Sequence, residues 1–150
     1  MNDLEDLYQQ LIIDHNRNPR NFRAMPDANR TAEGDNPLCG DRIKLYLRVE
    51  GGRVAEATFQ GSGCAISKAS ASMMTQAVQG KSEEEAERLF QAFHAMVTSP
   101  ATAPAETEAL GKLAAFAGVR AFPARVKCAN LAWHTLHAAL AARAEPVSTE

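Results

Sequence analysis

Several features that would point to a membrane or a nucleic acid are missing from this chain of 150 residues. No apolar run approaches the roughly 18 residues that a membrane-spanning helix needs, and residues 1–6 are acidic where a secretory signal peptide would be basic. The 16 Lys and Arg residues form no basic block and are outnumbered by 18 Asp and Glu residues. We therefore expect a cytoplasmic protein with neither a membrane nor a nucleic acid as its partner.

Cysteine is also scarce, since the chain has only Cys39, Cys64 and Cys128. An odd number argues against a closed disulfide framework and leaves buried thiols, metal ligands or reactive thiols as interpretations. The hydrophobic fraction of 45% and the length suit one compact domain over residues 1–150. The question of function thus depends on three thiols within an ordinary globular chain.

Hydrophobic periodicity predicts helices around one hairpin, which is typical of an α+β fold. The expected helices span residues 3–15, 65–79, 82–98, 106–117 and about 124–143. Ser82 and Glu85 form a capping box at the start of the third helix. Residues 21–37 and 99–106 are expected to be loops, the second because it holds two prolines.

The hairpin is expected over residues 42–60, as a small antiparallel sheet packed against the helices. Residues 42–50 alternate strictly between apolar and polar side chains, and Gly51 and Gly52 mark the turn. A two-residue loop would set Leu47 against Glu56, whereas a loop over residues 51–53 gives one apolar face. The three-residue loop predicts the pairs Leu45 with Phe59, Leu47 with Ala57 and Val49 with Ala55.

Cys39 and Asp41 have the same parity as the apolar residues of the first hairpin strand. If the strand extends back to them, both side chains face the core, where an ionised carboxylate needs a partner, a hydrogen bond or a metal. The alternative is that Gly40 breaks the alternation and lets Asp41 turn to water or cap a backbone amide. For Asp41 alone, both interpretations stay open.

Cys64 and Cys128 are each placed by a helix. Cys64 follows Gly63 at the start of a helix, where free N–H groups and the dipole favour a thiolate, although a small buried residue is the simpler interpretation. Cys128 lies on an inward arc of small residues in the final helix. His134 and His137 point away from Cys128 on that helix, and we expect them to be solvated.

Three thiols and the Asp41 carboxylate could converge on one tetrahedral metal. Such a donor set suits zinc or iron-sulfur chemistry, and a carboxylate makes the site more exchangeable than four cysteines would. The separations of 25 and 64 residues between the cysteines match no local zinc-finger pattern. Spacing alone therefore leaves a metal site as one interpretation among several.

The chain resembles the IscU/SufU family of iron-sulfur cluster assembly proteins over nearly its whole length. Four segments carry the resemblance in chain order: Asp14-His15 with Asn18-Pro19-Arg20-Asn21, Asn36-Pro37-Leu38-Cys39-Gly40-Asp41-Arg42-Ile43, Gly61-Ser62-Gly63-Cys64-Ala65-Ile66-Ser67 and Arg125-Val126-Lys127-Cys128-Ala129. Four ordered motifs are far more specific than a cysteine pattern. The resemblance implies the α+β fold, with a small antiparallel sheet, that the periodicity also favours.

Within this family the chain looks like the SufU branch. Lys127 stands where IscU scaffolds carry a histidine, and SufU-like proteins have a helical insertion that would fall within residues 81–118. Residues 122–127 replace the chaperone-binding segment of IscU. A dedicated chaperone partner is therefore not expected.

The resemblance implies zinc bound by Cys39, Asp41, Cys64 and Cys128. It also implies a partner, a cysteine desulfurase dependent on pyridoxal phosphate, whose persulfide sulfur Cys39 accepts and relays to downstream assembly proteins or apoproteins. On this basis the protein is a zinc-dependent sulfurtransferase partner rather than a stand-alone enzyme. Arg125 and Lys127 are candidates for steering the persulfide or contacting the partner, although plain surface charge explains them equally well.

Two alternatives remain. In the first, an iron-sulfur cluster is assembled on the same residues and passed to apoproteins, a scaffold function that Lys127 in place of histidine weakens. In the second, the protein is a small zinc-stabilised interaction module without sulfur chemistry. Stimulation of a desulfurase separates both alternatives from the sulfur relay.

Overall fold

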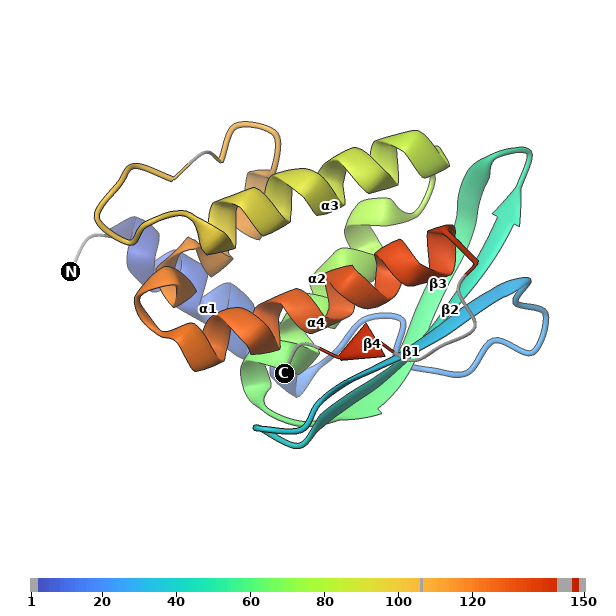
Figure 1. The fold of residues 1–150 in the computed structure, drawn as a ribbon, viewed down its shortest axis with the longest axis horizontal. Helices are drawn as coiled ribbons and strands as arrows, with labels where there is room; N and C mark the ends of the chain where they lie inside the picture. Colours follow the sequence, from blue (N-terminus) through green and yellow to red (C-terminus); the bar gives the residue numbers. More distant parts are fainter. Residues whose placement is uncertain (1–2, 106, 143–146, 149–150) are drawn as a thin grey trace.

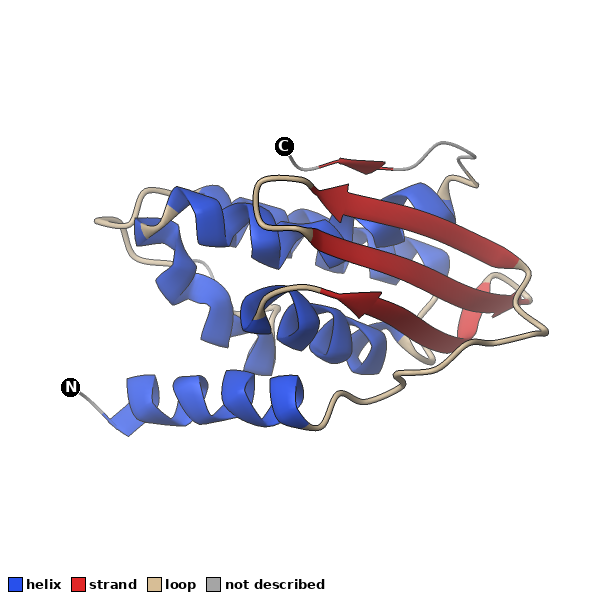
Figure 2. Cartoon of the chain, turned by 90° about the horizontal axis from the view of Figure 1, so that it is seen from below, coloured by secondary structure: helices blue, strands red, loops and turns tan. Residues whose placement is uncertain are grey.

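Helices cover one face of a four-stranded sheet in the computed structural model (Figures 1 and 2), which describes residues 3–105, 107–142 and 147–148. The strand order is β3-β2-β1-β4. The strands are β1 (Arg30–Asn36), β2 (Asp41–Glu50), β3 (Arg53–Ser62) and β4 (Val147–Ser148). The helices are α1 (Asp3–Arg17), α2 (Ala65–Val78), α3 (Glu83–Thr98), the 3₁₀ helix η1 (Gly111–Ala121) and α4 (Pro123–Leu140). The expected α+β fold is confirmed.

The core lies between the sheet and two of these helices. α4 packs on β1 and β2, α2 packs on β3 and on α4, and α3 packs on α4 and η1. Leu45, Leu47 and Phe59 from the sheet and Trp133 from α4 are fully buried in this layer. No described helix has the length and apolar character needed to cross a membrane.

Two of the predicted helices agree closely with the structure, and three differ at their ends, the first because α1 continues to Arg17. α2 and α3 begin where expected, and the capping box of α3 is confirmed, because Glu85 N–H donates to Ser82 Oγ and Ser82 N–H donates to the Glu85 carboxylate. η1 starts at Gly111 and passes through Gly118, where a loop was expected. α4 ends at Leu140 rather than near residue 143, and the expected ends at Glu106 and Arg143 lie outside the described residues.

The hairpin has the predicted strand register but a different turn. Leu45 pairs with Phe59 and Leu47 with Ala57, as expected, whereas Val49 pairs with Val54 rather than with Ala55. The loop therefore has two residues, Gly51 and Gly52, and both have the positive φ that a type I′ turn requires. Ala55 is the extra residue of a β-bulge, which restores the apolar face after the short turn. The prediction of a three-residue loop was wrong because it considered no bulge.

β1 lies in a segment that was expected to be loop. Its inward positions are Ala32, Gly34 and Asn36, only one of which has an apolar side chain, so alternation gave no strand signal. Gly34 explains this composition, because a Cβ there would collide with Thr135 Oγ1 and touch Leu131 of α4. β4 pairs parallel to β1, so the sheet is mixed rather than purely antiparallel.

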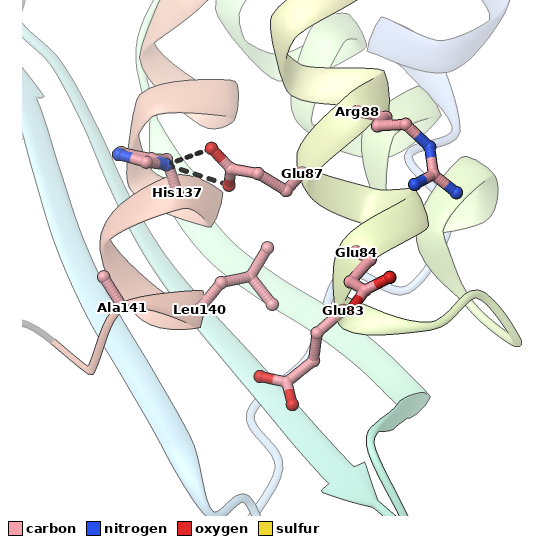
Figure 3. A pocket seen from close by; sticks show the side chains of 7 residues that line it. All are labelled: Glu83, Glu84, Glu87, Arg88, His137, Leu140 and Ala141. Atoms are coloured by element: carbon pink, nitrogen blue, oxygen red, sulfur yellow. Dashed lines mark hydrogen bonds and ion pairs between the residues drawn. The ribbon is translucent and has the colours of Figure 1, made fainter.

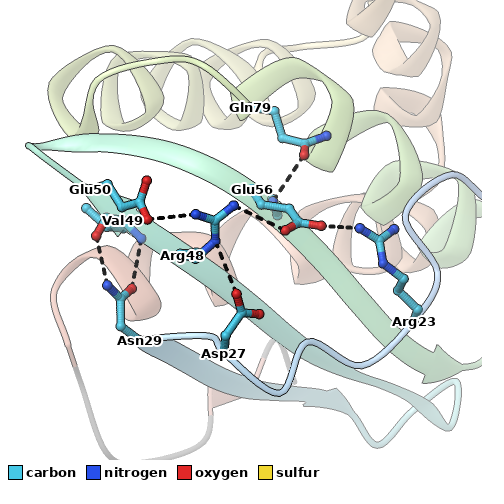
Figure 4. A network of polar contacts seen from close by, with 9 residues as sticks. Arg23, Asp27, Asn29, Arg48, Val49, Glu50, Glu56 and Gln79 are labelled. Atoms are coloured by element: carbon cyan, nitrogen blue, oxygen red, sulfur yellow. Dashed lines mark hydrogen bonds and ion pairs between the residues drawn. The ribbon is translucent and has the colours of Figure 1, made fainter.

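The loop between α1 and β1 is attached to the outer side of the hairpin by polar contacts (Figure 4). Asn29 exchanges two hydrogen bonds of 2.8 Å with the backbone of Val49. Glu56 accepts from Arg23 of the loop and from Arg48 of β2. Exposed ion pairs contribute little individually, so the backbone bonds of Asn29 are the firmer tie that aligns the start of β1.

The histidines of the final helix are not solvated as expected. His134 and His137 are half-buried, and their rings lie against Phe90 of α3 with centroid separations of 5.2 and 4.8 Å. His137 also contacts the Glu87 carboxylate. The polar arc of α4 is therefore covered by α3, which the helical periodicity of α4 alone did not indicate.

Substitution of Gly34 by alanine is expected to destabilise the protein by about 1–3 kcal/mol, since the added methyl overpacks the β1–α4 contact. Urea denaturation measures this difference. Gly118→Ala is the matched control, because a Cβ there meets no atom within 4 Å. Equal stability of the two variants would contradict the proposed close packing.

Acidification is expected to lower the free energy of unfolding through His15. This side chain is buried and hydrogen-bonded to Ser72 Oγ at 2.7 Å, and burial lowers its pKa below the usual 6.5. The unfolded chain then binds more protons, so stability present above about pH 6.5 is lost as the pH falls below it. Urea denaturation from about pH 7.5 to about pH 5.5 should show a smaller decrease in His15→Gln than in the wild type; equal decreases would exclude His15 as the cause.

Candidate metal centre

Three separate parts of the chain bring the predicted ligands to one end of the sheet. Cys39 lies in the turn that joins β1 to β2, and Asp41 is the first residue of β2. Cys64 is the N-cap of α2, and Cys128 lies near the start of α4. In Figure 1 the β1–β2 turn lies below the start of α2 and the first turns of α4.

The distances between the donor atoms suit a tetrahedral metal. Ligand atoms of Cys39, Asp41 and Cys128 all lie within 4.8 Å of one another, and Cys64 Sγ lies 3.9 Å from Asp41 Oδ2. Bond lengths of about 2.3 Å to sulfur and about 2.0 Å to oxygen place tetrahedral ligands roughly 3.5–3.8 Å apart. The sulfurs of Cys39 and Cys128 and one Asp41 oxygen are therefore close enough to share a zinc ion, and Cys64 lies outside this group but adjoins it through Asp41.

Asp41 is fully buried, and its two oxygens have different surroundings. Oδ1 accepts a 2.8 Å hydrogen bond from the backbone N–H of Cys64, and Oδ2 faces the cysteine sulfurs. Both interpretations of Asp41 thus hold in part, since it faces inward and also binds a backbone amide. One oxygen stays available to a cation while the other fixes the start of α2.

Gly63 makes room for this carboxylate. Its φ is +143°, and a Cβ at this position would overlap Asp41 Oδ1. The glycine before Cys64 therefore allows strand β2 and the start of α2 to approach closely.

Cys39 differs from the expectation that its side chain would face the core. Gly40 has a φ of +69°, which breaks the strand between Cys39 and Asp41 and leaves Cys39 exposed in the turn. The alternation was correctly extended to Asp41 but not as far as Cys39. The site consequently has one exposed thiol, beside the half-buried Cys64 and the buried Cys128.

Burial controls the protonation of the innermost thiol. Desolvation raises the pKa of Cys128 far above its ordinary value, and hydrogen bonds with Asp41, Cys39 and Cys64 raise it further. The raised pKa favours the neutral Cys128 thiol, and a bound cation would favour the thiolate. Cys64 Sγ accepts a hydrogen bond from the Ser67 N–H at 3.4 Å.

Asn36 belongs to this centre although it was not among the predicted site residues. It is fully buried at the end of β1, directly opposite Asp41 in the register. Its Nδ2 lies 3.5 Å from Asp41 Oδ2 and 3.7 Å from Cys128 Sγ. Recognition of β1 as a strand was the missing signal, because pairing across the β1–β2 turn places Asn36 beside Asp41.

Arg125 and Lys127 lie on the first turns of α4. Arg125 is exposed, with its guanidinium 4.3 Å from the ring centre of Phe122, and Lys127 is half-buried. The described residues show no hydrogen bond or ion pair between either side chain and the cysteines. Their part in sulfur chemistry stays a prediction.

A different hollow lies between α3 and the end of α4 (Figure 3). Its lining residues are Glu83, Glu84, Glu87, Arg88, His137, Leu140 and Ala141. It contains no cysteine, and the Glu87 carboxylate already contacts His137. Among the described residues, the triple of Cys39, Asp41 and Cys128 is the one group of this kind with ligand atoms close enough to hold a metal.

The chain belongs to the family of NifU-like N-terminal domains, whose profile matches residues 7–129. This match agrees with the resemblance to the IscU/SufU family, which the relatives described next confirm.

The chain is 44% identical over 138 residues to the zinc-dependent sulfurtransferase SufU of Bacillus subtilis (strain 168), covering 92% of each protein. It is 41% identical over 137 residues to the iron-sulfur cluster assembly scaffold protein IscU of Streptococcus pyogenes serotype M1, covering 91% of this chain and 84% of the relative. A crystal structure of a candidate cluster assembly scaffold protein for the SUF system from Fervidobacterium islandicum AW-1 superposes with a TM-score of 0.82 at 32% identity, covering 91% of this chain and 98% of that one.

Gly63→Ala is expected to weaken Zn²⁺ binding by about 10- to 100-fold, because the new methyl displaces the Asp41 carboxylate. Competition with a chromophoric chelator measures the affinity. Gly80→Ala is the control, since Gly80 also has a positive φ, +83°, but faces open space. Unchanged Zn²⁺ affinity in Gly63→Ala would show that the position of Asp41 does not matter for the metal.

Proposed function

We propose that this protein takes part in iron-sulfur cluster biogenesis as a zinc-binding sulfur acceptor. It receives persulfide sulfur from a pyridoxal phosphate-dependent cysteine desulfurase and relays it to cluster assembly. The observation that carries the proposal is that one thiol of the cysteine and aspartate group, Cys39, is exposed, whereas Cys128 and Asp41 are buried. The names of the relatives support both zinc and cluster assembly.

The ligands would be Cys39, Asp41, Cys64 and Cys128. Bound zinc would keep the thiols deprotonated at neutral pH without redox activity of its own. This requirement fits Cys128 in particular, since burial raises the pKa of its thiol. The buried ligands would form the permanent part of the site and the exposed one its exchangeable part.

Cys39 is the proposed acceptor. Its thiolate attacks the outer sulfur of the desulfurase persulfide, so that a new S–S bond forms on Cys39 Sγ. The old S–S bond breaks, and the desulfurase cysteine leaves as a thiolate with the electron pair. The exchange needs no oxidant, because one persulfide replaces another.

The surroundings of Cys39 suit a protein partner. Its neighbour Leu38 is 69% exposed in the β1–β2 turn, so an apolar side chain is available to a partner directly beside Cys39. The surroundings of Gly40 in this turn are open, since a Cβ at that position would meet nothing within 4 Å. Arg125, whose guanidinium lies over the half-exposed Phe122 ring, and Lys127 are basic residues of α4 close to Cys128 in the chain that could attract an anionic persulfide.

A cluster scaffold is the second candidate function, favoured by the name of the Streptococcus relative. Three sulfurs and one oxygen could also hold an iron-sulfur cluster. A scaffold binds iron and acid-labile sulfide, absorbs visible light and transfers its cluster to an apoprotein. A sulfur relay needs only zinc and the stimulation of desulfurase turnover.

Cys39→Ala is expected to abolish stimulation of a cysteine desulfurase while the protein stays folded, because three ligands remain. Turnover is measured with cysteine and a reductant, and mass spectrometry should find one added sulfur atom on Cys39 of the wild type. Full stimulation by Cys39→Ala would refute the acceptor assignment. Iron and labile sulfide in the wild type, without stimulation, would favour the scaffold.

The buried ligand Cys128 provides the comparison for this experiment. Cys128→Ala should lose zinc and thermal stability together, since metal binding and folding are coupled in such sites. If Cys128→Ala instead retained full zinc content, Cys128 would not be a ligand. The two variants thus separate sulfur acceptance from metal retention.

A further inference from the structure

The inner wall of the metal centre contains an amide whose position is unfavourable for the fold alone. Asn36 is fully buried, and its Oδ1 is without a hydrogen-bond partner among the described residues. A buried polar atom that lacks a partner typically costs about 1–3 kcal/mol. An apolar side chain of the same shape would avoid this cost, so Asn36 needs another explanation.

The other end of the amide faces the candidate ligands. Nδ2 lies 3.5 Å from Asp41 Oδ2 and 3.7 Å from Cys128 Sγ. An NH₂ group has two N–H donors and can serve two acceptors at once. Asp41 and Cys128 come from different elements, β2 and α4, and Asn36 contacts both of them without belonging to the candidate ligands.

Charge makes these contacts stronger in the metal-bound state. A carboxylate and a thiolate are anionic when they bind a cation, and hydrogen bonds to charged acceptors are roughly twice as strong as neutral ones. Burial away from water increases the effect. The free energy lost by burying Oδ1 without a partner is the same with and without the metal. The free energy gained from the Nδ2 hydrogen bonds is greatest when the metal is bound.

We propose that Asn36 is a positioning residue of the metal centre, which orients Asp41 and Cys128 through its amide N–H groups and thereby raises metal affinity. This inference rests on the proposed zinc site, and it adds a residue that does not itself bind the metal. Residues that hydrogen-bond to ligands typically contribute about 10- to 100-fold to metal affinity.

The test compares two variants, Asn36→Leu and the control Asn130→Leu. Asn36→Leu keeps the approximate shape of the side chain and removes both N–H donors. Asn130 is also buried with an unpartnered Oδ1, but its Nδ2 contacts His94 rather than a ligand. Zn²⁺ affinity is measured by chelator competition, the absorption spectrum with Co²⁺, and stability by urea denaturation of the metal-free proteins.

Asn36→Leu is expected to bind Zn²⁺ about 10- to 100-fold more weakly than the wild type and to shift the sulfur-to-Co²⁺ charge-transfer band. Its metal-free stability should be no lower than that of the wild type, because the unpartnered Oδ1 is removed, and Asn130→Leu should bind both metals normally. Asn36→Ala also removes both donors without adding bulk and should lose affinity to a similar extent, which provides a measurement if the leucine variant does not fold.

Unchanged Zn²⁺ affinity and an unchanged Co²⁺ spectrum in Asn36→Leu would overturn the inference. So would an affinity loss that Asn130→Leu shares, because it would then follow from packing in general. These results leave the proposed zinc site intact. Failure of the wild type to bind Zn²⁺ at all would instead overturn the zinc site and the role of Asn36 together.

Discussion

The buried carboxylate of Asp41 is the constraint on which the rest of the centre depends. Burying an ionised carboxylate costs several kcal/mol unless it is paired, hydrogen-bonded or bound to a metal. Here one oxygen accepts from the Cys64 N–H, and the other faces Asn36 and the sulfurs of the site. This single group therefore ties β2 to the start of α2 and leaves its second oxygen facing the thiols.

The arrangement around Asp41 divides the thiols by access to solvent. Cys128 is held inside by α4, Cys64 is half-buried at the cap of α2, and Cys39 is exposed in the β1–β2 turn. A site whose thiols differ in solvent exposure in this way can retain a metal through its buried ligands while its exposed ligand reacts with another protein. The proposed sulfur transfer would use that combination, whereas a purely structural metal site would gain nothing from an exposed ligand.

Much of the fold followed from local rules that act within one element. The α3 capping box, the apolar alternation of β2 and the glycine break before α2 each depend on neighbouring residues, and each was correctly predicted. The turn of the hairpin was predicted incorrectly because a bulge at Ala55 and a shorter loop give the same strand register. β1 was not predicted as a strand because its contact with α4 requires Gly34, and a glycine weakens the sequence pattern of a strand.

The sequence by itself determined which residues could carry chemistry, since the scarcity of cysteine and four ordered motifs pointed to Cys39, Asp41, Cys64 and Cys128. Only the tertiary structure decided how these residues meet and which of them water reaches. Those properties arise from contacts between β1, β2, α2 and α4, which are distant in the chain, so no local pattern encodes them. For the same reason Asn36 became visible as part of the centre only when strand pairing placed it opposite Asp41.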